Sequence, residues 1–146
     1  MVQKPQSALQ FCGFGGQGII LATTVLGDAA VRAGLNAVQT QSFGAEARGG
    51  ECQAQLIIAP GPIFSPVVTS FDVLVALSKP ALNRYLPRLK NGGLLIIDPH
   101  LVNKPARFDI TIYTIPATFL AATHLGQKIV ANMIILGCLQ QITSIV

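Results

Sequence analysis

The amino-acid sequence predicts an α/β fold built on a parallel sheet. Two observations carry this prediction. Short apolar runs alternate with helical patterns along the chain, which is the order that gives a parallel sheet covered by helices. A glycine-rich turn stands between the first apolar run and the first helical pattern, at the place where such folds bind ligands. With 146 residues the chain has the length of about one domain, and we expect a single domain over residues 1–146.

The first half of the chain supplies most of the predicted strands. We expect strands over residues 8–12, 36–42, 52–60 and 71–78. A helix is expected over residues 18–32, with Gly34 just beyond its end, where glycine accepts the left-handed backbone of a helix stop. Segment 52–60 changes from alternating to continuously apolar residues, as a strand does when it enters a buried sheet.

The second half continues the alternation. Pro80 is predicted to open a helix that runs to about Lys90 and stops at Gly92 and Gly93. Further strands are expected over residues 94–98 and 109–116, followed by helices over 117–125 and from 128 to about 143. The sequence stops in an apolar helix with no polar tail, which indicates either truncation at the C-terminus or a contact surface.

Composition points to a subunit of a larger assembly. Charged residues make up 11% of the chain, well below the roughly 25% of an ordinary soluble domain, so we expect partner subunits to cover part of the surface. The net charge is +4, and four cations gather between residues 79 and 90. We interpret Lys79, Arg84, Arg88 and Lys90 as a solvated helix face and expect no nucleic-acid partner, because RNA-binding aromatic signatures are absent.

The cysteines argue against a metal site and for a reducing compartment. Cys12, Cys52 and Cys138 are odd in number and form no CxxC pair, so we expect no metal ligation by this chain and a cytoplasmic location. The first ten residues are short and polar, unlike a signal peptide. The apolar tail from Ile129 carries several amides and hydroxyls, so we predict a buried amphipathic helix and no membrane span.

The glycine-rich turn has the pattern of a phosphate-holding loop. Gly13, Gly15 and Gly18 match G-x-G-x-x-G between a predicted strand and a predicted helix. We assign Gly13 to a tight turn, Gly15 to close backbone approach, and Gly18 to the packing of helix against strand. The helix start would offer free N–H groups and the positive end of its dipole to a phosphate.

The acid that a dinucleotide enzyme needs is missing. It would lie at the end of the second strand, roughly 20 residues beyond the loop, where the sequence has Gln39, Thr40 and Gln41. This counts against NAD. A structural turn and a phosphate loop both remain open, and Gln17 favours the second, because an amide at a helix start can bond a ligand or partner.

A second unusual segment spans residues 41–52. Arg48 stands beside Gly49 and Gly50, between Glu46 and Glu51. Two glycines permit close backbone approach, and a guanidinium can grip a carboxylate or phosphate at two points. The alternative is an ion pair within the chain.

No catalytic set emerges from the remaining residues. His100 and His124 are interpreted as structural, and Asp98 as either a functional strand-end acid or the start of a turn. Cys52 lies close in sequence to Arg48, which could lower the pKa of its thiol, although a buried inert thiol is the favoured interpretation.

Five segments of the sequence match a known family in the same order. These are GFGGQGIILA, QSFGAEARGGECQAQLII, PIFSPVVTSFDVLVALS, GGLLIID and ANMIILG, from Phe11 to about Leu139. Together they resemble the gamma subunit, or gamma domain, of the 2-oxoacid:ferredoxin oxidoreductases of the pyruvate, 2-oxoglutarate and 2-oxoisovalerate types. The resemblance implies a Rossmann-like three-layer α/β domain with a mostly parallel sheet, and a chain that usually continues some tens of residues beyond the point of Val146.

The resemblance also implies a function. Such enzymes convert a 2-oxoacid and coenzyme A to acyl-CoA, carbon dioxide and reduced ferredoxin. Thiamine diphosphate, Mg and iron–sulfur clusters would be held by alpha, beta and possibly delta subunits, with ferredoxin as electron acceptor and no cofactor bound firmly by this chain alone. The chain itself would do no bond-making chemistry and would position coenzyme A or brace the thiamine-bearing subunits.

Carried over by position, the resemblance implies these site residues: Gly13, Gly15, Gly16, Gln17, Gly18, Arg48, Gly49 and Gly50. Two alternatives stay open: a free-standing nucleotide-binding α/β module, and a purely structural subunit whose glycine loop binds nothing.

Overall fold

The computed structural model describes residues 5–43 and 50–146. Within them, six strands form one sheet in the order β2-β3-β1-β4-β5-β6. The strands are β1 (Ser7–Phe14), β2 (Asn36–Phe43), β3 (Glu51–Ala59), β4 (Phe71–Ala76), β5 (Leu89–Ile97) and β6 (Thr111–Thr114). The helices are α1 (Ile19–Arg32), α2 (Lys79–Tyr85), α3 (Ala117–His124) and α4 (Ala131–Thr143), with two short 3₁₀ turns, η1 (Leu86–Arg88) and η2 (Lys128–Val130).

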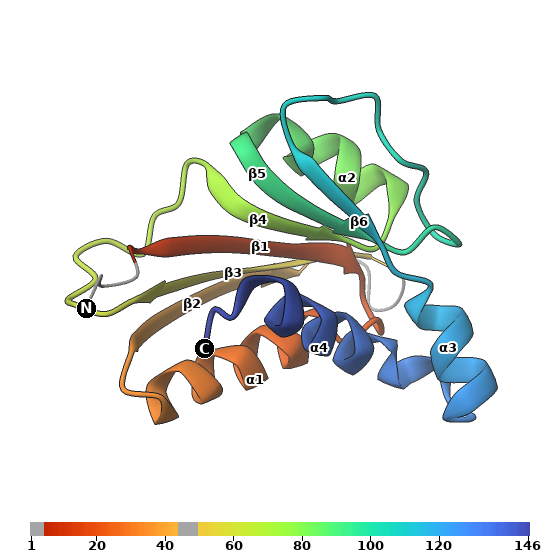
Figure 1. Ribbon diagram of the computed structural model, residues 1–146, viewed down its shortest axis with the longest axis horizontal. Coiled ribbons are helices and arrows are strands. Elements are labelled where there is room, and N and C mark those ends of the chain that lie inside the picture. Colours follow the sequence, from red (N-terminus) through yellow and green to blue (C-terminus); the bar gives the residue numbers. More distant parts are fainter. Residues whose placement is uncertain (1–4, 44–49) are drawn as a thin grey trace.

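The elements stack in three layers, as the resemblance implied. Figure 1 shows α1 and α4 on one face of the sheet and α2 on the other. Leu9 and Phe11 of β1 pack in the core beneath α1 and α4, while Ala8 and Cys12 belong to the core beneath α2. This alternation follows from the period of two in a strand, so both faces of β1 are buried. The predicted α/β fold is confirmed.

The sheet is mostly parallel, as the resemblance implied, with one strand that runs against its two neighbours. β1–β4, β4–β5 and β5–β6 pair in parallel, whereas β3 runs antiparallel to both β1 and β2. Only residues 44–50 separate β2 from β3. A parallel crossover needs a dozen or more residues, so β3 returns beside β2 in the opposite direction and enters the sheet between β2 and β1.

The predicted helix from Pro80 to about Lys90 is too long. α2 ends at Tyr85, η1 follows, and β5 already begins at Leu89. Pro87 explains the early end, because proline lacks the N–H that an α-helix interior requires. Gly92 and Gly93 therefore lie inside β5 and stop no helix. Gly92 has φ +76 in a bulge, where the pairing of β5 with β4 shifts register.

The other boundaries agree closely with the predictions. α1 ends at Arg32 and Gly34 takes φ +84 just beyond it, as expected for a helix stop.

None of the helices among residues 5–43 and 50–146 is long and apolar enough to cross a membrane.

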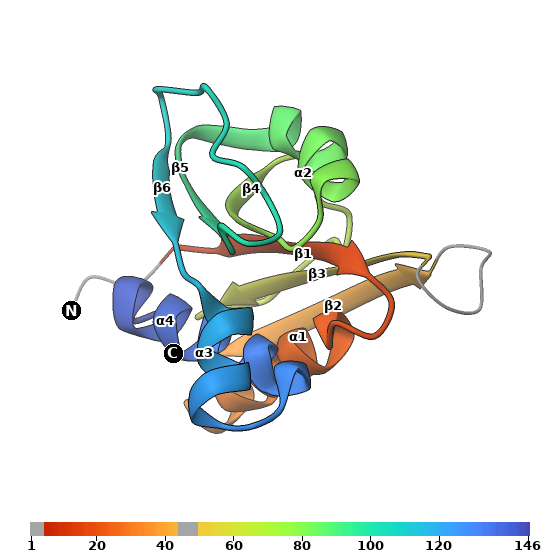
Figure 2. The same cartoon turned by 90° about the vertical axis from the view of Figure 1, so that its right-hand side faces the viewer.

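The path of the chain creates a switch point between β1 and β4. From β1 the chain passes through α1 toward the β2 edge, and from β4 it passes through α2 toward the β6 edge, on the opposite face (Figures 1 and 2). In doubly wound sheets, ligands bind outside the carboxyl ends of the strands at such a point. The glycine loop, between β1 and α1, lies there.

Candidate functional site

The glycine loop is built on two backbone conformations that favour glycine. Gly16 has φ +91 and Gly18 has φ +73, both in the left-handed region. The N–H of Gln17 donates to the carbonyl of Phe14 at 3.3 Å and closes the turn. The turn therefore forms at Gly16, beyond the end of β1.

Gly13 does not form the tight turn that the sequence pattern suggested. It lies inside β1, paired with Cys52 of β3. A Cβ at Gly13 would overlap Oε1 of Gln17 and would lie 3.2 Å from Cβ of Leu77. The absence of a side chain at Gly13 therefore leaves the space that Oε1 of Gln17 occupies.

Gly15 makes the close backbone approach expected of it. Its N–H donates to the carbonyl of Gly50 at 2.8 Å. Gly50 ends the Arg-Gly-Gly segment, so one residue of that segment contacts the glycine loop. Glu46, Arg48 and Gly49 lie outside the described residues.

Gly18 packs against a helix, which corrects its assignment to helix-against-strand packing. A Cβ at Gly18 would collide with the side chain of Asn132, in the first turn of α4. The Nδ2 of Asn132 also donates to the carbonyl of Gly18 at 3.2 Å. This contact fixes the start of α1 against α4, across 114 residues of sequence.

The N-terminus of α1 faces a groove. No side chain among the described residues caps this end of the helix, so its first N–H groups and its positive dipole end are free to meet an anion. The groove has a volume of about 500 Å³. It is lined on the loop side by Gly15, Gly16, Gly18 and the first turn of α1, and on the other side by Cys52, Ile129, Val130, Asn132 and Met133. We call it the glycine-loop groove.

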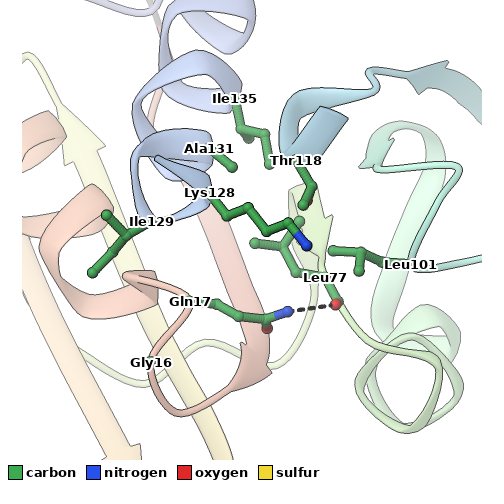
Figure 3. Close-up of a pocket in the computed structure, with 9 residues that line it drawn as sticks. All are labelled: Gly16, Gln17, Leu77, Leu101, Thr118, Lys128, Ile129, Ala131 and Ile135. Atoms are coloured by element: carbon green, nitrogen blue, oxygen red, sulfur yellow. Dashed lines mark hydrogen bonds between the residues drawn. The ribbon is translucent and has the colours of Figure 1, made fainter. Parts of the chain in front are cut away.

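A second hollow adjoins the first at the carboxyl ends of β1 and β4. This switch-point pocket has a volume of about 260 Å³ (Figure 3). It is lined by Gly16, Gln17, Leu77, Leu101, Thr118, Lys128, Ile129, Ala131 and Ile135. Gly16 and Ile129 line both hollows, so the tip of the loop separates them. The walls are mainly apolar, and the Lys128 ammonium supplies a positive charge.

Sequence reasoning missed Lys128, Thr118 and Asn132. Lys128 is the one charged residue in the stretch 110–146, and that isolation was the available signal. Thr118 and Asn132 carry no sequence signal, because their roles depend on contacts with Asp98 and Gly18, far away in the chain.

The surroundings of Asp98 indicate a structural role and not a catalytic one. It is fully buried, and its two oxygens accept hydrogen bonds from the N–H of His100 and from Thr118. His100 stacks on the ring of Phe119 at a centroid distance of 5.9 Å. His124 is exposed at the end of α3.

The cysteine thiols are held in unreactive environments. Burial raises the pKa of the Cys52 thiol. This agrees with the favoured interpretation of a buried inert thiol and not with a pKa lowered by Arg48. Burial, and then the charge of Glu51, raise the pKa of the Cys12 thiol far above its ordinary value. Cys12 and Cys52 belong to the cores on opposite faces of the sheet. Among the described residues, no group of three or more Cys, His, Asp or Glu side chains could hold a metal ion.

The basic residues between 79 and 90 are engaged mainly within the chain. Arg84 pairs with Glu51, and Lys90, which belongs to β5 and not to a helix, pairs with Asp72 at 3.0 Å. Arg88 lies 4.7 Å from the centroid of the Phe71 ring and donates to the carbonyl of Thr69 at 3.1 Å. Lys79 and Arg84 are exposed on α2, whereas Arg88 is half-buried on η1 and Lys90 lies on β5, so the predicted solvated helix face holds only its first two cations.

The chain matches one family over nearly its whole length. The model of the family described as "Pyruvate ferredoxin/flavodoxin oxidoreductase" matches residues 8–146. The 2-oxoglutarate synthase subunit KorC of Methanocaldococcus jannaschii is 43% identical over 98% of this chain and 78% of its own length. The KorC subunit of Methanothermobacter marburgensis is 47% identical over 94% of this chain and 78% of its own length.

Solved structures agree. The gamma subunit of a keto/oxoacid ferredoxin oxidoreductase from Geobacter sulfurreducens superposes with a TM-score of 0.86 at 35% identity, over 98% of this chain and 79% of that one. A chain of the 2-oxoglutarate:ferredoxin oxidoreductase from Magnetococcus marinus, solved with 2-oxoglutarate, coenzyme A and succinyl-CoA bound, superposes with a TM-score of 0.85 at 26% identity, over 94% of this chain and 24% of that one. On these matches, the chain belongs to the pyruvate ferredoxin/flavodoxin oxidoreductase family and is a gamma subunit of a 2-oxoacid:ferredoxin oxidoreductase.

Proposed function

We propose that this gamma subunit positions coenzyme A for the acyl transfer that the assembled oxidoreductase performs. The phosphates of coenzyme A would lie at the glycine loop and the start of α1, with Lys128 and Arg48 as their cations. The observation that carries the proposal is the N-terminus of α1, which no described side chain caps and which opens onto a groove of about 500 Å³ beside two glycines in the left-handed conformation.

The shape and polarity of the two hollows suit this ligand. Coenzyme A combines an anionic nucleotide end with a long, less polar arm. The helix start and Lys128 offer positive potential, and the apolar walls around Ile129 and Met133 offer a surface for the arm. A related enzyme, the one from Magnetococcus marinus, was solved with coenzyme A bound.

We assign the other reaction components to partner subunits. In this proposal, alpha, beta and possibly delta subunits hold thiamine diphosphate, Mg and the iron–sulfur clusters, ferredoxin accepts the electrons, and the complex works in the cytoplasm. The cysteines support this division, because Cys12 and Cys52 lie in different cores and Cys138 lies on α4. The chain therefore contributes binding and orientation to the rate.

The 2-oxoacid is proposed to be 2-oxoglutarate. Relatives named as 2-oxoglutarate synthase subunits are 43% and 47% identical to this chain, whereas a pyruvate synthase subunit PorC from Methanothermobacter thermautotrophicus is 31% identical. The purified complex should reduce a dye faster with 2-oxoglutarate than with pyruvate or a branched-chain 2-oxoacid.

The coenzyme A role is tested by Arg48→Ala in the assembled complex. Loss of a charge-assisted hydrogen bond, worth roughly 1.5–3 kcal/mol, should raise the KM for coenzyme A by about tenfold or more and leave the KM for the 2-oxoacid unchanged. Arg32→Ala, at an exposed arginine in the last turn of α1, is the matched control. Unchanged kinetics in the Arg48 variant, with the complex intact, would favour the purely structural alternative, in which the loop only packs against a neighbour.

A further inference from the structure

Gln17 bridges the two strands that flank the switch point. Its Oε1 accepts a hydrogen bond of 2.7 Å from the N–H of Phe14, at the end of β1. Its Nε2 donates a hydrogen bond of 3.0 Å to the carbonyl of Leu77, directly after β4 (Figure 3). One amide thus closes the crevice between the carboxyl ends of β1 and β4, where a doubly wound sheet would otherwise open.

Gly13 makes this bridge possible. A methyl group at residue 13 would overlap Oε1 of Gln17, while its other close neighbours, Cβ of Leu77 and Cδ1 of Ile19, would lie at 3.2 and 3.3 Å. The main obstacle to a side chain at residue 13 is therefore Gln17 itself. The first glycine and the glutamine of the GxGGQG motif form one unit.

The bridge acts on the residue beside it. Gly16 immediately precedes Gln17 and has φ +91, and no atom of the described residues would lie within 4 Å of a Cβ added to it. Packing around Gly16 therefore does little to hold it. Its position depends on the neighbouring anchors, the Gly15 N–H bound to Gly50 and the Gln17 amide. Because Gly16 lines both hollows, a shift of Gln17 changes the wall that they share.

We propose that Gln17, seated in the space left by Gly13, is a positioning residue that holds Gly16 and the open start of α1 in place for coenzyme A. The Gln17 amide acts through the backbone of the loop, because its oxygen and its nitrogen are already hydrogen-bonded to Phe14 and Leu77. This role rests on the proposed function, because it concerns the same ligand.

A double-mutant cycle in the purified complex tests the unit. Gln17→Ala removes the bridge, and Gly13→Ala displaces it, so each should raise the KM for coenzyme A by about tenfold. The double variant should differ from Gln17→Ala by less than about twofold, whereas independent sites would multiply to about a hundredfold. The KM for the 2-oxoacid should stay within about twofold in all three, since a merely structural defect would weaken both substrates alike.

Two further variants keep the test decisive. Gln17→Met retains the side-chain volume while removing both hydrogen bonds. If Gln17→Ala impairs assembly of the complex, the KM for coenzyme A is measured with Gln17→Met instead. Gln6→Met, at an exposed glutamine before β1, is the matched control.

The outcomes separate the two proposals. If Gln17→Met leaves the KM for coenzyme A unchanged while Lys128→Met raises it, the positioning role is wrong and the proposed function stands. If neither variant nor Arg48→Ala changes that KM, the proposed function fails and the positioning role fails with it. Multiplicative effects in the cycle would likewise overturn the pairing of Gly13 with Gln17.

Discussion

Thr118, in the first turn of α3, donates two hydrogen bonds to one oxygen of Asp98, directly after β5. The backbone N–H lies 2.9 Å from Oδ2, and the hydroxyl lies 2.7 Å from the same atom. The other oxygen accepts the N–H of His100 at 2.9 Å. Asp98 is wholly buried, so these bonds replace its hydration. The pair fastens α3 to the sheet and sets Thr118 in the wall of the switch-point pocket.

Asp98→Ala should lower the free energy of unfolding by about 3 kcal/mol or more, because it leaves buried donors without an acceptor. Asp98→Asn should cost less, since one carbonyl oxygen remains. Urea unfolding of the purified chain measures both. Asp28→Ala, at an exposed position on α1, should stay within about 0.5 kcal/mol of the unchanged chain. An equally small effect at Asp98 would show that α3 is held by other contacts.

Gly18→Ala should destabilise the chain more than Gly34→Ala. Both glycines have positive φ, +73 and +84, so both substitutions carry left-handed strain of about 1–2 kcal/mol. A Cβ added at Gly18 also meets the side chain of Asn132, whereas a Cβ added at Gly34 meets no atom within 4 Å in the part of the chain that the structure describes. Urea unfolding should therefore separate the two variants by about 1 kcal/mol or more.

The double variant Gly18→Ala with Asn132→Ala isolates the packing part of that cost. Removing the Asn132 amide frees the space that the new methyl group needs, so the two substitutions should be less than additive. Additive free energies of unfolding would mean that backbone strain alone accounts for the loss at Gly18.

The sequence predicted the elements whose signals are local. The helix stop at Gly34 and the apolar strand that became β4 follow from backbone preference and hydrophobic pattern. The direction of β3 was missed, because alternation of strands and helices says nothing about a return through a short connection. The end of α2 was missed because Gly92 and Gly93 looked like a stop, while Pro87 and the bulge at Gly92 decided the outcome.

The place of the glycine loop was predicted, but the contacts of its residues were not. The motif correctly indicated a glycine loop at the carboxyl end of the first strand. Its spacing could not show that Gly13 makes room for Gln17 or that Gly18 makes room for Asn132, because those neighbours depend on the folded packing. The roles of Arg48 and Gly49 in ligand binding stay predictions.

Cys12 should make the stability of the chain fall at alkaline pH. Burial, together with the charge of Glu51, raises the pKa of its thiol in the folded chain above the ordinary value of 9.0. The folded state therefore keeps a proton that the unfolded chain releases above about pH 9, so the stability is complete below that pH and declines as the pH rises through it. The expected slope for this one thiol is about 1.4 kcal/mol per pH unit.

Urea unfolding of the purified chain between about pH 8 and pH 10.5 measures this slope. Cys12→Ala should reduce the slope by that amount, whereas Leu74→Ala, which removes a buried apolar side chain from the same core, should lower stability at every pH without changing the slope. If the two variants share the slope of the unchanged chain, the Cys12 thiol does not resist ionisation, and the core beneath α2 admits water.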